Sequence, residues 1–345
     1  MYVTYVCFKV AALPTLECKV DTIETSLASE TPLPVVLWHG LGDHANSAFM
    51  IHTAKCIQSV HPGTLVHSIQ FFDSPSQDQQ AGLSGNLTSQ LVEVCQQLNK
   101  IPGLGHGFDA LGFSQGGLFL RGYMERCTSQ PSSSGDTGND GSMCGGCLGP
   151  SIRNLITFGS PHNGVFDLPN AWRWWGGLRW RSIVWRDWTQ GHVVVSQYFR
   201  DPNSEIEYEN YLKHSNFLAD VNNEREVKTR SYGQNLARLN KLVLIMFEDD
   251  EMIKPKESAW FWEFNQSTKK SIKLEDRDIY KQDWIGLKQL DQKNGIVYML
   301  VGGGHMEVTD ELVTFIAKAY LGKPANLEGT NQLSQPDLKF IDQAI

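Results

Sequence analysis

Residues 108–117 read FDALGFSQGG, and this stretch decides the fold. Its first six residues form an apolar run with the length of a buried strand, which leads into Ser114 inside a G-x-S-x-G pattern. A helical pattern follows, up to Cys127. Strand, tight turn and helix in this order predict a nucleophile elbow, in which Gly112 and Gly116 leave room for the sharp turn. The bland alternative, a glycine-rich turn with an ordinary serine, fits this context less well.

Five other apolar runs are similar to this strand in length and composition. Each is apolar on both faces, as in a parallel sheet buried between two layers of helices. The runs cover residues 35–38, 64–72, 154–158, 242–247 and 296–301. A helical pattern over residues 87–98 separates two of the expected strands, which is typical of β-α-β units. We therefore predict an α/β fold with a mostly parallel central sheet flanked by helices.

The chain divides into one large domain with two insertions. We predict a single domain over residues 34–322, preceded by an irregular lead-in at 1–33 that we interpret as a degenerate signal region. Residues 128–148 are rich in Ser, Gly and Asp and indicate a flexible surface insert. Residues 166–225 carry six of the ten tryptophans and lie between two predicted strands, which favours a cap over the sheet. Residues 323–345 form a polar tail.

Composition excludes several classes of protein. The chain has 30 basic and 38 acidic side chains, and a net charge of −8 argues against a nucleic-acid partner, whose phosphates need Lys and Arg. A hydrophobic content of 41% is that of a globular protein. No apolar run approaches the roughly 18 residues of a membrane-spanning helix. Seven cysteines are too few for a small disulfide scaffold.

Signals for the cellular compartment are weak. Two N-x-S/T sequons make Asn86 and Asn265 candidates for N-glycosylation. The apolar start of the chain is shorter than a signal peptide requires, and Lys9 interrupts it. The residues by themselves therefore leave the compartment open.

The general base is selected by chain order. In proteins with this elbow the triad runs Ser, then Asp or Glu, then His, which leaves His192, His214 and His305. Only His305 follows a predicted strand, and the three glycines before it suit a loop that brings an imidazole close to the serine. His192 and His214 fall in the cap and are interpreted as surface or packing residues. His162 precedes every acid that fits, so we interpret it as structural or pocket-lining.

The acid is ambiguous from the residues alone. The strand at 242–247 runs into four adjacent carboxylates, Glu248 to Glu251. Burying several of them together would be costly, so most must be solvated, while one can orient the histidine. Asp249 and Asp250 are both candidates.

An oxyanion hole requires two backbone N–H donors. The first is expected from Gln115, directly after the serine. The second is expected from Leu41, which lies between two glycines in the turn after the strand at 35–38. A plain glycine turn is the alternative for this second position.

Six segments, in this order along the chain, resemble the palmitoyl-protein thioesterase family. They are VLWHGLGD (36–43), LGFSQGG (111–117), GSPHNGVFDLP (159–169), FLADVNNER (217–225), KPKESAWFWEF (254–264) and QDWIGLKQLD (282–291). The resemblance runs from about Pro34 to Gly322 and is far more specific than G-x-S-x-G alone.

The resemblance implies an α/β-hydrolase that removes long-chain fatty acyl groups, palmitoyl in particular, from cysteine thioesters through an acyl-serine. Matched motif by motif, it assigns the nucleophile, acid and base to Ser114, Asp250 and His305, and the oxyanion hole to Leu41 and Gln115. It thereby selects one of the two candidate aspartates. It also implies S-acylated proteins or peptides as partners, no metal or organic cofactor, and a place in the lysosome or secretory pathway.

The cysteines follow the family only in part. The resemblance implies a disulfide between Cys95 and Cys127. Cys144 and Cys147 lie in the insert, which is foreign to the family. A lone C-x-x-C has no second pair of ligands for zinc, so we interpret these two as a local disulfide or as free thiols.

Two other functions remain open beside the thioesterase. One is a lipase or carboxylesterase that acts on oxygen esters, because a triad does not by itself distinguish the two kinds of ester. The other is a catalytically inactive, hydrolase-like carrier of lipid or protein. The tryptophans of the cap suggest an apolar groove for an acyl chain and peripheral membrane contact. Ordinary packing is the favoured alternative for most of these rings.

Overall fold

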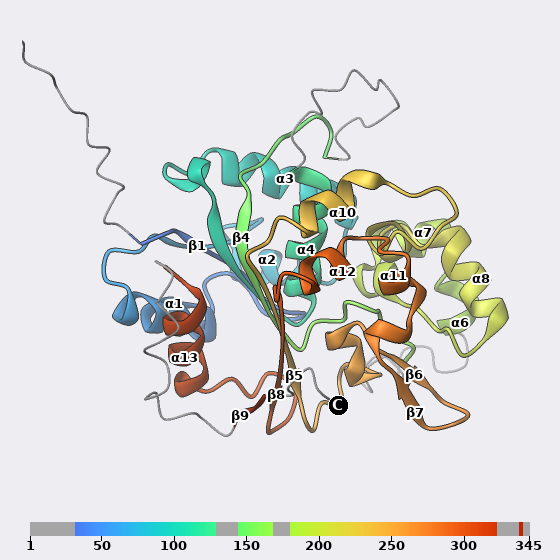
Figure 1. Ribbon diagram of the computed structural model, residues 1–345. Coiled ribbons are helices and arrows are strands. Elements are labelled where there is room, and N and C mark those ends of the chain that lie inside the picture. The colour runs from blue at the N-terminus through green and yellow to red at the C-terminus, as the bar shows by residue number, and fades with distance from the viewer. Residues whose placement is uncertain (1–31, 129–143, 168–179, 323–337, 341–345) are drawn as a thin grey trace, which may run out of the picture. The chain divides into compact units, whose positions relative to one another are not determined.

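The computed structural model describes residues 32–128, 144–167, 180–322 and 338–340 (Figure 1). Within them the central sheet has the strand order β2-β1-β3-β4-β5-β8-β9. The strands are β1 (Val35–Trp38), β2 (Val66–Ser68), β3 (Phe108–Phe113), β4 (Ile152–Phe158), β5 (Lys241–Phe247), β8 (Ile296–Val301) and β9 (Leu338–Phe340). All neighbours in this order are parallel except β8 and β9. The predicted α/β fold with a mostly parallel sheet is therefore confirmed.

The predicted strands differ from the observed ones mainly at the edges of the sheet. β1, β3 and β8 have the predicted bounds, whereas β2 is limited to three residues of the run at 64–72. An edge strand has one neighbour only, so its pairing with β1 sets its length. The polar tail contributes β9, which pairs with β8.

Alternate residues of the central strands supply two separate hydrophobic cores. Val36 and Ala110 point into one cluster, and Val35 and Leu111 point into the other, as the two-residue period of a strand requires. The side chains of β1 and β3 are buried on both faces. This burial requires a layer of helices on each side of the sheet.

Helices cover both faces of the sheet (Figure 1). α1 (Ala48–Val60) and α13 (Asp310–Tyr320) pack on one face, and α3 (Leu87–Asn99), α4 (Gln115–Cys127) and α10 (Arg230–Leu236) pack on the other. Three of them begin at a residue whose side-chain oxygen accepts a backbone N–H of the first turn, as preferred N-caps do. These caps are Ser47, Asn86 and Thr309.

Shorter elements surround this frame. α2 (Pro75–Ala81) and the 3-10 turn η1 (Leu104–His106) lie beside the first strands, and the two-stranded sheet β6 (Glu263–Asn265) and β7 (Lys270–Ile272) lies apart from the main sheet. The remaining elements, most of them in or near the cap, are α6 (Trp180–Ile183), α7 (Asp187–His192), η3 (Val194–Tyr198), α8 (Glu205–His214), α9 (Leu218–Val221), η4 (Lys256–Trp260), η5 (Leu274–Asp276), α11 (Asp278–Lys281) and α12 (Leu287–Asp291).

The tryptophans of the cap serve mainly as packing where they are described. The rings of Trp180 and Trp185 both pack edge-on against Phe199, with centroids 6.5 and 5.6 Å away. Trp188 is 67% exposed and stacks on His192. The packing interpretation is thus confirmed for the first two rings. The other three tryptophans of this segment, Trp172, Trp174 and Trp175, lie outside the described residues.

A buried ion pair joins two parts of the segment at 166–225. Arg200 donates two hydrogen bonds of 3.1 Å to Glu224, which also accepts from the hydroxyls of Tyr208 and Tyr211. Burial raises the pKa of Glu224, but the charges of Arg200 and Arg277 and these hydrogen bonds outweigh it, so the pKa is lowered from 4.5 to about 2. The carboxylate therefore stays ionised in acidic surroundings.

Glu224→Gln is expected to destabilise the protein most at neutral pH. The difference between 4.5 and about 2 corresponds to about 3 kcal/mol of stability. Because the folded-state pKa is the lower one, this stability is present above about pH 4.5 and is lost as the pH falls toward about 2. Urea denaturation of wild type and variant should show a difference that shrinks on acidification. Glu209→Gln, on an exposed position of α8, should change little, and a pH-independent loss in Glu224→Gln would contradict the linkage.

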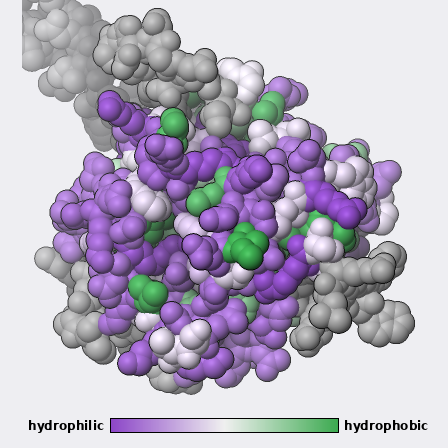
Figure 2. Space-filling view, turned by 90° about the vertical axis from the view of Figure 1, so that its right-hand side faces the viewer, coloured by the Kyte–Doolittle hydropathy of each residue, from purple (hydrophilic) through white to green (hydrophobic). Residues whose placement is uncertain are grey.

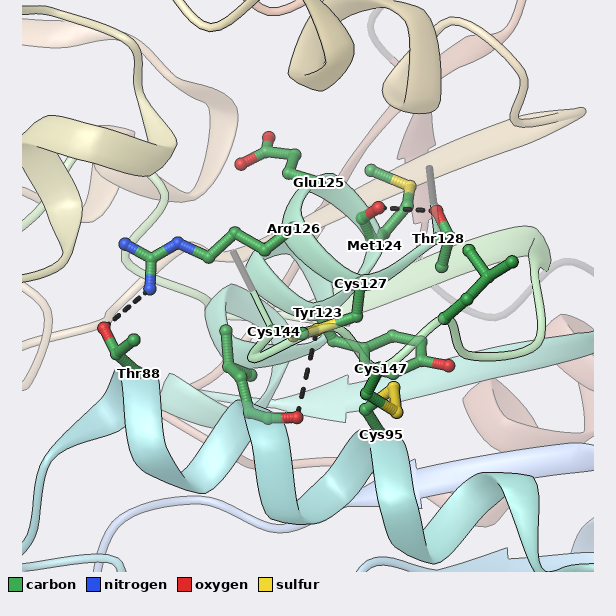
Figure 3. The surroundings of a disulfide bond; sticks show 12 residues. Thr88, Cys95, Tyr123, Met124, Glu125, Arg126, Cys127, Thr128, Cys144 and Cys147 are labelled. Carbon is green, nitrogen blue, oxygen red and sulfur yellow. Dashed lines mark hydrogen bonds between the residues drawn. A yellow bond between two sulfur atoms is a disulfide. The ribbon is translucent and has the colours of Figure 1, made fainter. Parts of the chain in front are cut away.

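The disulfides differ from the one that the resemblance implies. Cys95 is bonded to Cys147 and Cys127 to Cys144, with Cα atoms 6.2 and 5.3 Å apart, so a Cys95–Cys127 bond is wrong (Figure 3). Both interpretations given for Cys144 and Cys147, a local disulfide and free thiols, are wrong as well. Gly145 has a positive φ that allows the tight turn there, and the turn directs one sulfur to α3 and the other to α4. The end of the insert thus fastens the two helices that flank β3.

Peptide mapping of the non-reduced protein is expected to recover the two cross-linked pairs of the structure. Bonds that close loops of this size add a few kcal/mol of stability in the chain-entropy model. Because Gly145 and Gly146 keep Cys144 and Cys147 on one peptide, cleavage before aspartates should give a single species in which that peptide is joined to the Cys95 and Cys127 peptides, and mass spectrometry detects it. Recovery of Cys95 linked to Cys127 would contradict the observed connectivity.

Candidate active site

Ser114 lies at the turn between β3 and α4. Its backbone has φ 52° and ψ −125°, a conformation rarely adopted by a residue other than glycine, and its N–H donates to the carbonyl of Phe158 at 2.7 Å. A Cβ added at Gly112 would overlap Gly117, and one added at Gly116 would overlap the backbone of Trp38. The two glycines therefore permit the turn, as the sequence predicts.

His305 connects Ser114 with Asp250. Its Nε2 lies 2.9 Å from the Ser114 Oγ, and its Nδ1 lies 2.7 Å from a carboxylate oxygen of Asp250. The Phe247 ring packs edge-on against the imidazole. The backbone of Gly159 also lies close to the imidazole, since a Cβ added there would come within 3.1 Å of the ring. Three groups from the ends of β3, β5 and β8 thus form one hydrogen-bonded chain.

The four carboxylates after β5 differ in their exposure to solvent. The side chain of Asp250 is 2% exposed, and its second oxygen accepts the backbone N–H groups of Met252 and Ile253, both at 2.9 Å. Asp249 and Glu251 are exposed. Of the four, only Asp250 is buried, and it lies within hydrogen-bond distance of the histidine.

The loop after β1 packs directly on the serine. A Cβ added at Gly40 would lie 3.2 Å from the Ser114 Cβ, and Leu41 is the next residue of this loop. Gln115 is the first residue of α4, so its N–H has no partner inside the helix. Throughout the described ranges, the N–H of Leu41 also donates no hydrogen bond. One unpaired backbone donor is thus next to Ser114 in the chain, and the other lies in the loop that packs on it.

Asp78 positions this loop, a role that the sequence analysis did not detect. One of its carboxylate oxygens accepts the N–H of Ala45 at 2.9 Å, and the other accepts the N–H of Phe71 at 2.8 Å. His39 lies beside it at 3.7 Å, and both side chains are buried. An aspartate inside the polar stretch SPSQDQQ carries no pattern that marks it as buried, so sequence alone offers no signal.

An apolar pocket of about 290 Å³ opens at the serine. The loop after β1, the elbow and the loop around His305 line this pocket, together with residues from other segments. Its lining residues are Gly40, Leu41, Asp43, Phe49, Phe113, Ser114, Val165, Val195, Tyr198, Met252, Ile253, His305 and Met306. Most of these side chains are apolar; the polar ones are Asp43, Ser114 and His305.

The contribution of the cap to this pocket differs from the expectation. None of the described tryptophans lines it; the cap supplies Val195 and Tyr198 of η3. The hydroxyl of Tyr198 donates to the side-chain oxygen of Gln115 at 3.1 Å, and the amide group of Gln115 donates to the carbonyl of Gly82 at 2.9 Å. Gln115 thus fastens the cap and the segment after α2 to the elbow.

His162 lies away from the pocket. Its ring is fully buried, stacks on Phe261 with centroids 4.7 Å apart, and lies 3.0 Å from the hydroxyl of Thr157. Burial, and then the charge of Arg121, lower the pKa of His162 well below its usual value. Of the two interpretations given for it, the structural one is therefore confirmed.

Known proteins identify the family. A family model described as palmitoyl protein thioesterase matches residues 34–305. The chain belongs to the palmitoyl-protein thioesterase family. Its fold is accordingly the α/β-hydrolase fold, with the observed parallel sheet and elbow.

The relatives cover most of the chain. Palmitoyl-protein thioesterase 1 of Caenorhabditis elegans is 35% identical over 297 residues, which is 84% of this chain and 91% of that protein. Lysosomal thioesterase PPT2-B of Xenopus laevis is 28% identical over 320 residues, 90% of this chain and 96% of that protein. Among solved structures, an esterase of the archaeon Pyrobaculum calidifontis is 13% identical, covers 84% of this chain and 74% of its own, and has a TM-score of 0.40.

Proposed function

We propose that the chain is a serine-dependent thioesterase that removes palmitoyl and similar long-chain acyl groups from the cysteines of lipidated proteins or peptides. Its family supports the thioester as the bond that is cleaved. The observation that carries the mechanism is His305 within hydrogen-bond distance of both Ser114 and Asp250, at the mouth of an apolar pocket.

In the first step the Ser114 hydroxyl attacks the thioester carbonyl. The proton moves from Oγ to Nε2 of His305, and the carboxylate of Asp250 stabilises the imidazolium that forms. The carbonyl oxygen gains negative charge, which the N–H groups of Leu41 and Gln115 stabilise. The C–S bond then breaks, the cysteine leaves as a thiol after taking the proton, and the acyl group stays on Ser114.

In the second step His305 accepts a proton from water, and the resulting hydroxide attacks the acyl-serine. The same two amides stabilise the second tetrahedral intermediate. The imidazolium returns the proton to Oγ, and the fatty acid leaves. Both steps use the same three side chains in the same geometry.

The apolar pocket is the proposed site of the acyl chain. It begins at Ser114 and is lined by Phe49, Val165, Val195 and Met252 among others, which removes apolar surface of the chain from water. Polar groups that would bind the head of a hydrophilic ester are few in this lining. A long-chain acyl group is therefore the favoured substrate.

Narrowing the pocket is expected to reduce turnover of long acyl chains selectively. Val195→Phe adds volume to the lining, so activity on a palmitoyl thioester should fall about tenfold or more, while activity on an acetyl thioester of the same thiol should change little. Steady-state kinetics on both substrates measure this. Val227→Phe, at a position that is 86% exposed, is the matched control. An equal loss on both substrates would contradict the pocket assignment.

The two alternative functions are less well supported. The intact hydrogen-bonded chain from Asp250 to Ser114 counts against an inactive carrier. A lipase or carboxylesterase would use the same groups, and it is the family that favours the thioesterase. Matched C16 thioester and C16 oxygen-ester substrates separate the two: we expect the higher kcat/KM on the thioester. Higher activity on the oxygen ester would overturn the proposed substrate class.

For location we propose the lysosome or the secretory pathway. Relatives named lysosomal thioesterases and the two disulfides support an oxidising compartment. Asn86 and Asn265 are both half-buried with side-chain oxygens that accept backbone N–H groups, and their glycosylation stays a prediction.

Membrane contact also stays a prediction. In the described ranges, no helix combines the length and the apolar character needed to cross a bilayer. Figure 2, which views the side of α7 and α8, shows a mostly hydrophilic face with separate hydrophobic spots. The exposed Trp188 on α7 is the candidate for contact with a lipid surface.

A further inference from the structure

Three side chains of the kinds that zinc takes as ligands lie together on the opposite side of the sheet from α3 and α4. His52 and Cys56 are one turn apart on α1, and Asp310 is the first residue of α13, the helix next to α1 (Figure 1). Nε2 of His52 lies 2.7 Å from a carboxylate oxygen of Asp310 and 3.6 Å from the sulfur of Cys56. All three donor atoms lie within 4.8 Å of one another.

One of these spacings matches that of a tetrahedral zinc site, and a second is shorter. Zinc bonds of about 2.0–2.3 Å at tetrahedral angles put neighbouring donor atoms roughly 3.3–3.7 Å apart. The distance from His52 to Cys56 already falls in this range. The distance from His52 to Asp310 is that of a hydrogen bond and would need to open by about 0.6 Å, with the ion taking the place of the shared proton.

The backbones that carry the three side chains are held firmly, while the side chains are accessible. α1 is anchored in the core by Met50 and Ile57, and α13 by Leu312 and Ile316. The side chains of His52 and Asp310 are 57% and 63% exposed, so small rotations cost little packing. Among the described cysteines, Cys56 is the one outside a disulfide.

We propose that His52, Cys56 and Asp310 bind one Zn²⁺, with water in the fourth position. Imidazole, thiolate and carboxylate are the donors that zinc takes in proteins. On binding, the S–H bond of Cys56 breaks, the sulfur gives an electron pair to the metal, and the proton passes to solvent. No oxidation state changes. The ion would cross-link α1 and α13.

The site escapes a search of the sequence for metal motifs. The spacing H-x-x-x-C from His52 to Cys56 places two donors on one helical face, but it has no second pair nearby in the chain. Asp310 lies 258 residues after His52 and is brought to it by the packing of α13 on α1. The sequence analysis expected no metal because the resemblance implies none.

The test is zinc binding by the full-length protein at neutral pH. Titration calorimetry with zinc chloride should give one site for the wild type. His52→Ala, Cys56→Ser and Asp310→Asn should each weaken binding at least about tenfold, the loss that even outer-shell partners cause. Glu311→Gln, which removes the adjacent exposed carboxylate of the same helix end, should leave the affinity unchanged. Hydrolase activity, equal in all five proteins, reports intact folding.

A second measurement identifies the ligands directly. Co²⁺ in place of zinc should give a thiolate-to-metal charge-transfer absorption that is absent in Cys56→Ser. Zinc should also raise the Tm of the wild type and of Glu311→Gln, but not of the three ligand variants. Equal zinc affinity in ligand variants and control, or no binding by the wild type, would overturn the proposal. Binding through cysteines elsewhere in the chain would show as a charge-transfer band that survives Cys56→Ser.

Discussion

Ser114→Ala is expected to lower turnover of a palmitoyl thioester by roughly 10⁴–10⁶-fold while the protein stays folded. The substitution removes the oxygen that would form the acyl intermediate, and neither His305 nor any described group beside it can replace that oxygen. Residual activity would come from the backbone donors at Leu41 and Gln115 and from substrate binding alone. The measurement is single-turnover hydrolysis with enzyme in excess.

Ser114→Ala is expected to leave the fold intact. The Ser114 side chain makes its hydrogen bond with His305, whereas the turn is held by the backbone bond to Phe158. Circular dichroism and the Tm should therefore change little. Ser84→Ala, at an exposed serine, should keep full activity. Near-normal turnover in Ser114→Ala would place the nucleophile elsewhere.

Asp250→Asn is expected to lower turnover by about 10⁴-fold. The asparagine amide cannot stabilise the imidazolium of His305, and it favours the wrong tautomer of the ring. Its oxygen can still accept the N–H groups of Met252 and Ile253, so the loop should keep its shape. The effect should therefore fall on kcat more than on Tm.

Asp249→Asn is the matched control, since it makes the same chemical change one residue earlier. Asp249 is exposed, and its contact with the histidine loop is a backbone bond from its N–H to the carbonyl of Gly303, which the substitution keeps. Turnover should change by less than about threefold. If Asp249→Asn were the more damaging of the two, the acid would have to be reassigned.

The parts of this site that the sequence predicts are those set by local pattern and chain order. The run at 108–113 and the glycines around Ser114 predict the elbow because strand, turn and helix are adjacent in the chain. Chain order then isolates His305. Asp250 is different: four neighbouring carboxylates share one local pattern, and only tertiary packing determines which of them is buried.

Features formed by distant segments escape local patterns. Tyr198 reaches Gln115 from the cap, and Asp78 holds the loop that contains Leu41; in each case the partner is dozens of residues away. The disulfides were also not predicted correctly from the sequence. The resemblance implies a bond between Cys95 and Cys127, whereas in the structure each of them is bonded to a cysteine of the insert. The space available to each side chain is decided by packing between elements.

The central claim is a covalent palmitoyl intermediate on Ser114, and its direct test is rapid quenching in acid of the protein mixed with a palmitoyl thioester, followed by peptide mass spectrometry. We predict a palmitoyl adduct on the peptide that contains Ser114 in the wild type and no adduct in Ser114→Ala. Turnover by the wild type with the adduct on another residue, or an adduct at this peptide that persists in Ser114→Ala, would contradict the account.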